Sequence, residues 1–229
     1  MSQEIKSIRL RLPYHLGSVN CYLVQTGTGY VLIDTGCSNQ RAALEQELGN
    51  AGCHPGNLTL IILTHGDFDH TGNAAYLRTR FGVPVAMQPD DFGMVERGDM
   101  FWNRNKGNRL IRKIVPFLFR FGPSDRFTPD VAVTDGFDLT CYGFEATVLS
   151  LLGHSSGSIG IRTSSGVLFC GDLFENTKQP VLNSIMDDGA AAAASAEKLK
   201  RLEITTVYPG HGQPFPLDLF VNNLAVSLA

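Results

Sequence analysis

Short apolar runs, separated by turn signals and helical segments, recur along this chain of 229 residues. Residues 5–12 alternate apolar and polar positions, which predicts a strand with one buried face. Residues 19–24 and 30–33 are two more apolar runs, and the Thr-Gly-Thr-Gly sequence between them predicts a hairpin. The same pattern predicts further strands at residues 60–63, 83–87, 137–139, 144–152, 158–162, 167–170 and 204–208.

Helical segments alternate with these strands. Ser38 is placed to cap a helix across residues 42–48. Three more helices are predicted, at residues 74–80, 190–202 and 217–228. A Ser/Thr/Gly turn precedes the strand at 167–170, as one precedes the strand at 30–33, which suggests two similar halves. Strands alternating with helices favour an α/β arrangement with the helices on the outer faces.

The composition is ordinary for a globular protein, with 43% hydrophobic and 18% charged residues. The net charge of −3 argues against a general nucleic-acid binder, and no apolar run approaches the ~20 residues of a membrane span. The first residues lack the layout of a secretory signal, so we expect a cytoplasmic protein. Five scattered cysteines without a C-x-x-C pair indicate buried thiols rather than disulfides.

The densest cluster of reactive side chains follows the apolar run at residues 60–63. It holds His65, Asp67, Asp69 and His70 within six positions. In open α/β sheets, sites are built where strands reach their carboxyl ends. Carboxylates this close repel one another unless a cation or solvent lies between them. The cluster therefore predicts a metal site.

Three further candidates share the same context, namely His154, Asp172 and His211. Each follows an apolar run and a glycine, so we expect each just past the end of a strand. A single histidine in such a place would more often be a structural residue. Together with the first cluster, the three favour one shared metal centre.

Residues 90–130 differ in character from the rest of the chain. Residues 97–126 hold eight of the 19 basic residues but only two acidic ones. Apolar positions at 110, 111, 114, 115 and 118 predict an amphipathic helix, bent near Pro116. Three interpretations stay open: a surface helix with a solvated basic face, a lid that favours anionic substrates, and a membrane-surface or subunit contact.

Several ordered motifs resemble those of the metallo-β-lactamase-fold hydrolase superfamily: residues 20–24, 31–36, 64–72, 153–158, 171–172 and 209–212. The resemblance covers nearly the whole chain. It implies the fold class α/β (α+β), a four-layer αββα sandwich with the metal site at one edge between two β-rich halves. We expect residues 1–229 to form a single domain of this fold, with a basic helical insertion at about 90–130.

The resemblance also implies two divalent metal ions, held by imidazoles and carboxylates. The first ion would be held by His65, Asp67 and His154. The second ion would be held by Asp69, His70 and His211. Asp172 would bridge the two ions, and Asp34 would support the ligands without contacting metal. The residues that bind the substrate cannot be named from the resemblance.

Position 67 departs from the family motif, which usually reads H-x-H-x-D-H. As a ligand, Asp67 would complete a two-His-one-carboxylate set, which suits iron or manganese at least as well as zinc. It would also lower the formal charge of the core by one, and it resembles a glutamate of some di-iron oxygen- or nitric-oxide-reducing relatives. Alternatively the first site is weak or empty, or the chain has kept the fold and lost catalysis.

We therefore expect a metal-dependent hydrolase that uses a metal-activated water on a small ester or thioester. Asp69 would bind metal and also orient the water. The alternatives are a di-iron redox protein that handles oxygen or nitric oxide, and a catalytically inactive binding module. The expected partner is a small molecule, which could be anionic in view of the basic insertion; neither nucleic acid nor a membrane span is expected. A homodimer is compatible with the sequence.

Overall fold

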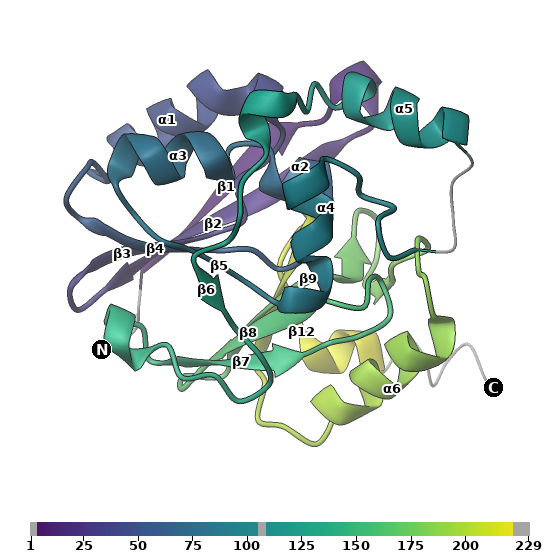
Figure 1. Ribbon diagram of the computed structural model, residues 1–229. Helices are drawn as coiled ribbons and strands as arrows, with labels where there is room; N and C mark the ends of the chain where they lie inside the picture. Colours follow the sequence, from purple (N-terminus) through teal and green to yellow (C-terminus); the bar gives the residue numbers. More distant parts are fainter. Residues whose placement is uncertain (1–3, 105–108, 222–229) are drawn as a thin grey trace.

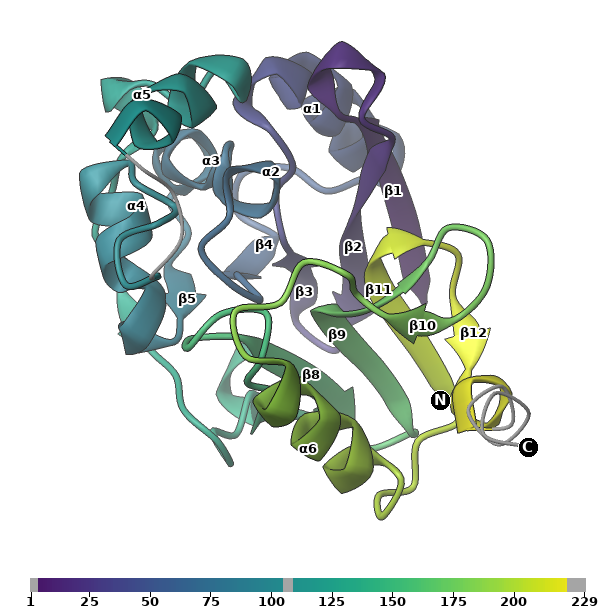
Figure 2. The same cartoon turned by 90° about the vertical axis from the view of Figure 1, so that its right-hand side faces the viewer.

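The computed structural model describes residues 4–104 and 109–221. Two β-sheets pack face to face, and helices cover both outer faces (Figures 1 and 2). The predicted four-layer αββα sandwich is confirmed. Among the described residues, no helix has both the length and the apolar character that a membrane crossing requires.

The first sheet contains the N-terminal strands in chain order, β1 to β6. Its strands are β1 (Ile5–Arg11), β2 (Ser18–Thr26), β3 (Gly29–Ile33), β4 (Leu58–Ile62), β5 (Val85–Met87) and β6 (Val131–Ala132). The pairs β1–β2 and β2–β3 are antiparallel, while β3 to β6 run parallel. The predicted hairpin joins β2 to β3, with Thr26 opposite Gly29.

The second sheet has the order β12-β11-β9-β8-β7, and β10 pairs with β9. Its strands are β7 (Ala146–Ser150), β8 (Ile159–Thr163), β9 (Val167–Asn176), β10 (Val181–Leu182), β11 (Thr206–Gly212) and β12 (Phe215–Pro216). Only β9 and β11 pair in parallel; the other neighbours in this sheet are antiparallel.

The α-helices are α1 (Arg41–Asn50), α2 (Phe68–Thr71), α3 (Ala74–Phe81), α4 (Phe92–Arg97), α5 (Arg109–Leu118) and α6 (Gly189–Leu199). Short 3-10 helices are η1 (Pro13–His15), η2 (Ser38–Gln40), η3 (Pro89–Asp91), η4 (Pro123–Asp125) and η5 (Thr140–Tyr142). Residues 217–221 begin the predicted C-terminal helix, and the rest of that prediction lies outside the described residues.

Alternation along the strands divides the apolar side chains among three layers. Val31 and Ile33 on β3 face Phe169 of the second sheet, in the core between the sheets. Leu32, between them in sequence, points the other way and packs with Leu44 of α1. A third cluster packs α6 on the outer face of the second sheet. The central strands are therefore buried on both faces, which is why they are continuous apolar runs, whereas the edge strand β1 alternates buried and exposed residues.

Two local predictions were wrong. Residues 137–139 form only an isolated bridge between Asp138 and Thr147, because a turn from Thr134 to Phe137 precedes them and η5 follows directly. Ser38 does not cap α1, since its hydroxyl donates to the carbonyl of Arg120 at 2.6 Å. This contact instead ties the start of the helix to the basic insertion.

The thiols of the chain are as predicted. All five cysteines are free, and Cys21, Cys37, Cys53 and Cys170 are buried. Burial raises the pKa of Cys53 to about 11 and that of Cys170 to about 12. These thiols are apolar packing groups rather than nucleophiles.

Candidate metal centre

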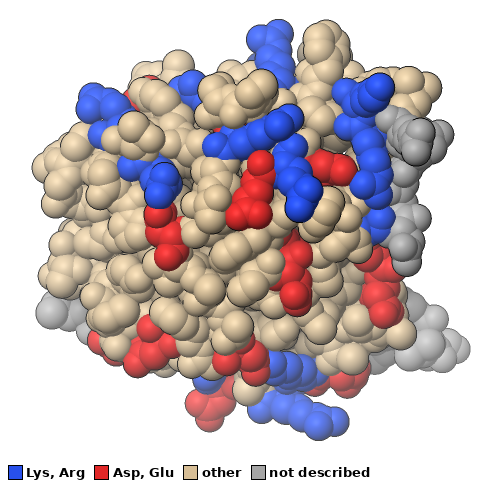
Figure 3. All heavy atoms as spheres, in the orientation of Figure 1, with Lys and Arg blue, Asp and Glu red and all other residues tan. Residues whose placement is uncertain are grey.

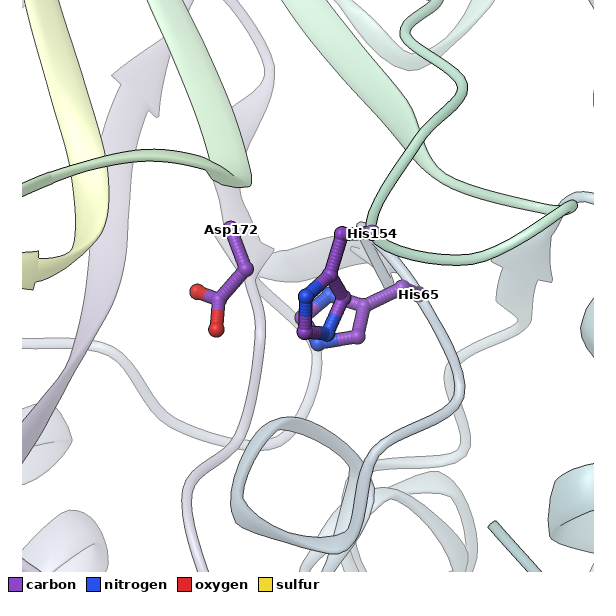
Figure 4. Close-up of side chains that lie close together, drawn as sticks. All are labelled: His65, His154 and Asp172. Carbon is purple, nitrogen blue, oxygen red and sulfur yellow. The ribbon is translucent and has the colours of Figure 1, made fainter. Parts of the chain in front are cut away.

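The predicted ligands converge at one edge of the sandwich, where the two sheets meet. The loop after β4 carries His65 and Asp67, and the short helix α2 carries Asp69 and His70. His154 comes from the loop between β7 and β8, Asp172 from β9 and His211 from β11. Figure 4 shows His65, His154 and Asp172 turned toward one another across the space between these elements.

Two groups of three side chains present potential ligand atoms, all within 4.8 Å of one another in each group. The first group is His65, His154 and Asp172. The second group is Asp69, His70 and His211. Imidazole nitrogens and carboxylate oxygens in threes are the donors that zinc, iron and manganese take in proteins.

Asp172 joins the two groups. Its Oδ1 lies 3.4 Å from Nε2 of His70, and its Oδ2 lies 3.2 Å from Nε2 of His211. Both histidines belong to the second group, while Asp172 itself belongs to the first. The carboxylate therefore stands between the groups, where the resemblance predicts a bridging ligand.

The centre contains buried polar atoms that the protein itself leaves without a hydrogen bond. Within residues 4–104 and 109–221, these include Nε2 of His65, Nε2 of His70 and Oδ1 of Asp172. An unsatisfied buried polar atom costs about 1–3 kcal/mol. A cation at the centre of these atoms would remove that cost, so the residues present fit the expected metal ions.

Each of the four histidines has a partner for Nδ1, the ring nitrogen that faces away from the centre. These partners are Thr64 Oγ1 for His65 at 3.0 Å, Asp34 Oδ2 for His70 at 2.8 Å, the Ile185 carbonyl for His154 at 2.6 Å and the Ser18 carbonyl for His211 at 2.8 Å. An Nδ1–H that donates to such an acceptor leaves the Nε2 lone pair free for metal.

Asp34 orients two of these imidazoles from one buried carboxylate. Besides Nδ1 of His70, its oxygens accept from the backbone N–H of Thr64 and from Oγ1 of Thr64, both at 2.8 Å. Because the Thr64 hydroxyl donates to Asp34, its oxygen is free to accept from Nδ1 of His65. Asp34 has a φ of 59°, a left-handed conformation that aspartate tolerates better than most residues.

Asp67 lies against the first group but has a second partner. Its Oδ2 is 3.0 Å from Nε2 of His154 and 3.8 Å from Nε2 of His65. Its Oδ1 is 2.8 Å from a guanidinium nitrogen of Arg104. This ion pair could not be predicted, because nothing in the sequence distinguishes Arg104 from the other basic residues of the insertion.

The charges of the centre depend on one another. Burial lowers the pKa of His211, but Asp172 outweighs it and raises that pKa to about 9. Burial raises the pKa of Asp172, but His211 and His70 hold it well below its usual range. Burial together with His70 and His154 lowers the pKa of His65, so that imidazole is neutral and ready to bind metal.

The expectation that each late ligand follows the end of a strand was wrong for two of them. Asp172 lies inside β9, and His211 lies inside β11. The parallel register between these strands shifts at Pro209 and again before His211. The irregularity lets the strands continue past the ligands while turning the side chains toward the centre.

Asp91, at the start of the insertion, links two ligand loops and was not predicted. Its fully buried carboxylate accepts from the N–H of Gly66 at 3.0 Å, from the Ser155 hydroxyl at 2.7 Å and from the N–H of Gly157 at 2.9 Å. Gly66 adjoins His65, and Ser155 adjoins His154. Asp91 therefore fixes the spacing between the two histidines of the first group.

The basic insertion is less solvated than its composition indicates. Arg104 is buried, Arg97 lies 3.7 Å over the ring of Trp102, and Arg112 pairs with Asp99 at 2.8 Å. Lys106 lies outside the described residues. In Figure 3, Lys and Arg still gather on the upper part of the face shown, over the outer helices, and acidic residues lie mainly below them.

The fold and this arrangement of histidines and aspartates define a class of metal-dependent hydrolases. Residues 15–211 match the family model described as the Metallo-beta-lactamase superfamily, so the chain belongs to that superfamily.

Among curated relatives, the chain is similar to a protein named probable metallo-hydrolase YqjP of Bacillus subtilis. The two are 24% identical over 93% of this chain and 73% of the relative. The chain is also 34% identical to hydroxyacylglutathione hydrolase GloC of Haemophilus influenzae, over 51% of this chain and 50% of that relative. The family and these names support hydrolase chemistry in general.

Among solved structures, one protein crystallised in a di-iron-bound form is 27% identical, with a TM-score of 0.69. The match covers 92% of this chain and 96% of that protein. A metallo-beta-lactamase family protein of Thermus thermophilus gives a TM-score of 0.72 at 22% identity, which shows the shared fold. Members of the superfamily bind divalent metal ions, but the metals of this chain and its individual ligands stay predictions.

Proposed function

We propose that this chain is a metal-dependent hydrolase of small thioesters or esters, and that its substrate carries negative charge. The observation that carries the proposal is the pair of buried three-residue groups joined by Asp172. Such a constellation costs stability in a protein that binds nothing there, because its inward atoms lack partners. Members of the superfamily use such ligand groups to hold metal ions that bind and activate a water.

The metal ions would supply an activated water, whose pKa falls from ~15.7 toward ~7, and polarise the substrate oxygen. Asp69 and His211 are the most exposed of these side chains, at 13% and 15%, so solvent and substrate approach from their side. Burial raises the pKa of Asp69. Its Oδ2 faces Nε2 of His70 and Nε2 of His211, so the other carboxylate oxygen would be the one that orients the attacking water.

The substrate class follows from chemistry and from one relative. Acylglutathione is a thioester, and the relative named hydroxyacylglutathione hydrolase aligns with 51% of this chain at 34% identity. The exposed basic side chains of the insertion, Lys113 and Arg120, would attract a substrate with carboxylates. We therefore place S-acyl thioesters of anionic thiols first among the substrates to be tested.

The test is a substrate panel of acylglutathiones, acyl-coenzyme A thioesters, lactones and nitrophenyl esters. The protein is loaded in turn with zinc, manganese and iron(II), and Asp172→Asn is assayed beside the parent. We expect thioester turnover by the parent and loss of both metal and turnover in Asp172→Asn. Asp218→Asn, at an exposed aspartate, should retain both. Turnover by Asp172→Asn without metal would refute the proposal.

A redox function is the second candidate, because one similar structure was solved in a di-iron-bound form. Asp67 adds a carboxylate, which suits iron at least as well as zinc. Iron-loaded protein that consumes oxygen or nitric oxide with an electron donor, while failing to hydrolyse the panel, would favour this candidate. Protein that binds no metal under any condition would instead favour a binding module, with the insertion as its contact surface.

A further inference from the structure

The ion pair between Asp67 and Arg104 is buried beside the first ligand group. The two side chains are 8% and 5% exposed, and the contact is 2.8 Å long. Buried charges of this kind persist only where each is compensated. Asp67 is the position where this chain departs from the histidine of its family, so the pair accompanies the departure.

Two further contacts, besides the one with Asp67, hold the guanidinium of Arg104 in place. Its Nε lies 2.7 Å from Oδ2 of Asp187, and a terminal nitrogen donates to the carbonyl of His154 at 3.3 Å. The guanidinium thus contacts the loop that presents His154 and the loop that presents Asp67. One nitrogen of the guanidinium contacts Asp67, and the other two contact Asp187 and the carbonyl of His154.

The two carboxylate oxygens of Asp67 have different neighbours. Oδ1 faces Arg104, and Oδ2 faces His154 and His65. A carboxylate held in this way offers one oxygen to the first ligand group, as a histidine would offer one nitrogen. The positive charge of Arg104 offsets the negative charge that aspartate brings.

We propose that Asp67 and Arg104 act as one unit that replaces the family histidine, in which Arg104 positions Asp67 and sets the charge at the first metal site. Removing the guanidinium leaves a buried carboxylate unpaired, so the metal-free protein loses stability. The same change makes the site more negative, so divalent ions bind more tightly. Replacing Asp67 by histidine alone leaves the buried guanidinium facing the metal and weakens metal binding.

The inference rests on the proposed metal centre, and its test does not use activity. Four proteins are compared: the parent, Arg104→Gln, Asp67→His and the double variant. For each, competition with a chromophoric chelator gives the free zinc concentration at half saturation. Thermal unfolding of the chelator-treated protein gives the stability without metal.

We expect at least tenfold tighter zinc binding in Arg104→Gln, with a metal-free unfolding midpoint several degrees lower. Asp67→His should bind zinc at least tenfold more weakly, and the double variant should return to within about threefold of the parent. Arg78→Gln is the matched control, because it removes the guanidinium of a different arginine–aspartate pair, the one with Asp130. It should leave zinc affinity unchanged.

Equal or weaker zinc binding in Arg104→Gln, or a double variant that binds zinc as weakly as Asp67→His alone, would overturn the inference. Should Arg104→Gln not fold, Arg104→Lys retains the charge and should stay within about threefold of the parent; a tenfold change would refute the charge argument. If the parent binds no zinc, manganese or iron, the proposed function itself is refuted. If the parent binds metal and Arg104→Gln has the same zinc affinity as the parent, only this inference is refuted.

Discussion

The ring of Phe68 stacks on the ring of Phe121, with centroids 4.2 Å apart and planes inclined by 15°. Phe68 opens α2, the four-residue helix that presents Asp69 and His70. Phe121 follows α5 at the far end of the basic insertion. A helix this short has little stability of its own. The insertion therefore serves as the packing surface that holds two ligands of the candidate metal centre in place.

Phe121→Ala should lower both the stability of the fold and the affinity for metal. Phe121 is 6% exposed, and truncating a buried phenylalanine costs about 3–5 kcal/mol. Chemical unfolding and chelator competition measure the two effects. Phe117→Ala is the matched control, because that ring is 77% exposed on the same segment and should change unfolding by less than ~0.5 kcal/mol. Unchanged zinc affinity in Phe121→Ala would show that α2 holds its ligands unaided.

Removing metal should destabilise the protein, because only the folded chain assembles the two ligand groups. A ligand at one hundred times its dissociation constant adds about 2.7 kcal/mol to the free energy of unfolding. We expect a chelator to lower the unfolding midpoint and added zinc or manganese to restore it. The midpoint of Asp172→Asn should respond much less to either. A parent midpoint indifferent to chelator would contradict a structural contribution from metal.

The elements and the site could be predicted to different degrees. The central strands were predictable because they are buried on both faces, which makes them apolar runs, and β1 was predictable from the alternation of its residues. The ligands stood out because imidazoles and carboxylates followed such runs at glycines. The motif also located Asp34, whose role depends on contacts with Thr64 and His70 that only the fold brings together.

What could not be predicted are pairings between distant segments. Arg104 lies 37 positions from Asp67 in the sequence. Asp91 accepts hydrogen bonds from Gly66 and Gly157, although its own segment has the composition of a surface loop. A lone charged residue in a basic or polar stretch carries no signal of the loop that it will meet. The bulged continuation of β9 and β11 past Asp172 and His211 was missed for a related reason, since a glycine predicts a turn and a bulge equally well.

Asp34→Asn should weaken metal binding more than it weakens the fold. An amide nitrogen facing Nδ1 of His70 would donate to it and move the imidazole proton to Nε2, the atom that faces the centre. Loss of such a supporting group typically costs 10–100-fold in metal affinity. Asparagine tolerates the left-handed backbone of position 34, so the unfolding midpoint without metal should change little. Unaltered zinc affinity would show that Asp34 does not set the tautomer of His70.

Asp130 should contribute a pH-dependent part of the stability. The side-chain hydrogen bond from Nε of Arg78, 2.7 Å long, is the main cause that lowers the pKa of Asp130, and the N–H of Val85 adds to it. A carboxyl whose pKa is lower in the folded state stabilises the fold above its unfolded pKa of about 4 and loses that contribution as pH falls through its folded pKa. Asp130→Asn should therefore unfold at lower urea than the parent at pH 7, and the gap should close below pH 4. A gap of the same size at pH 3 would refute this origin.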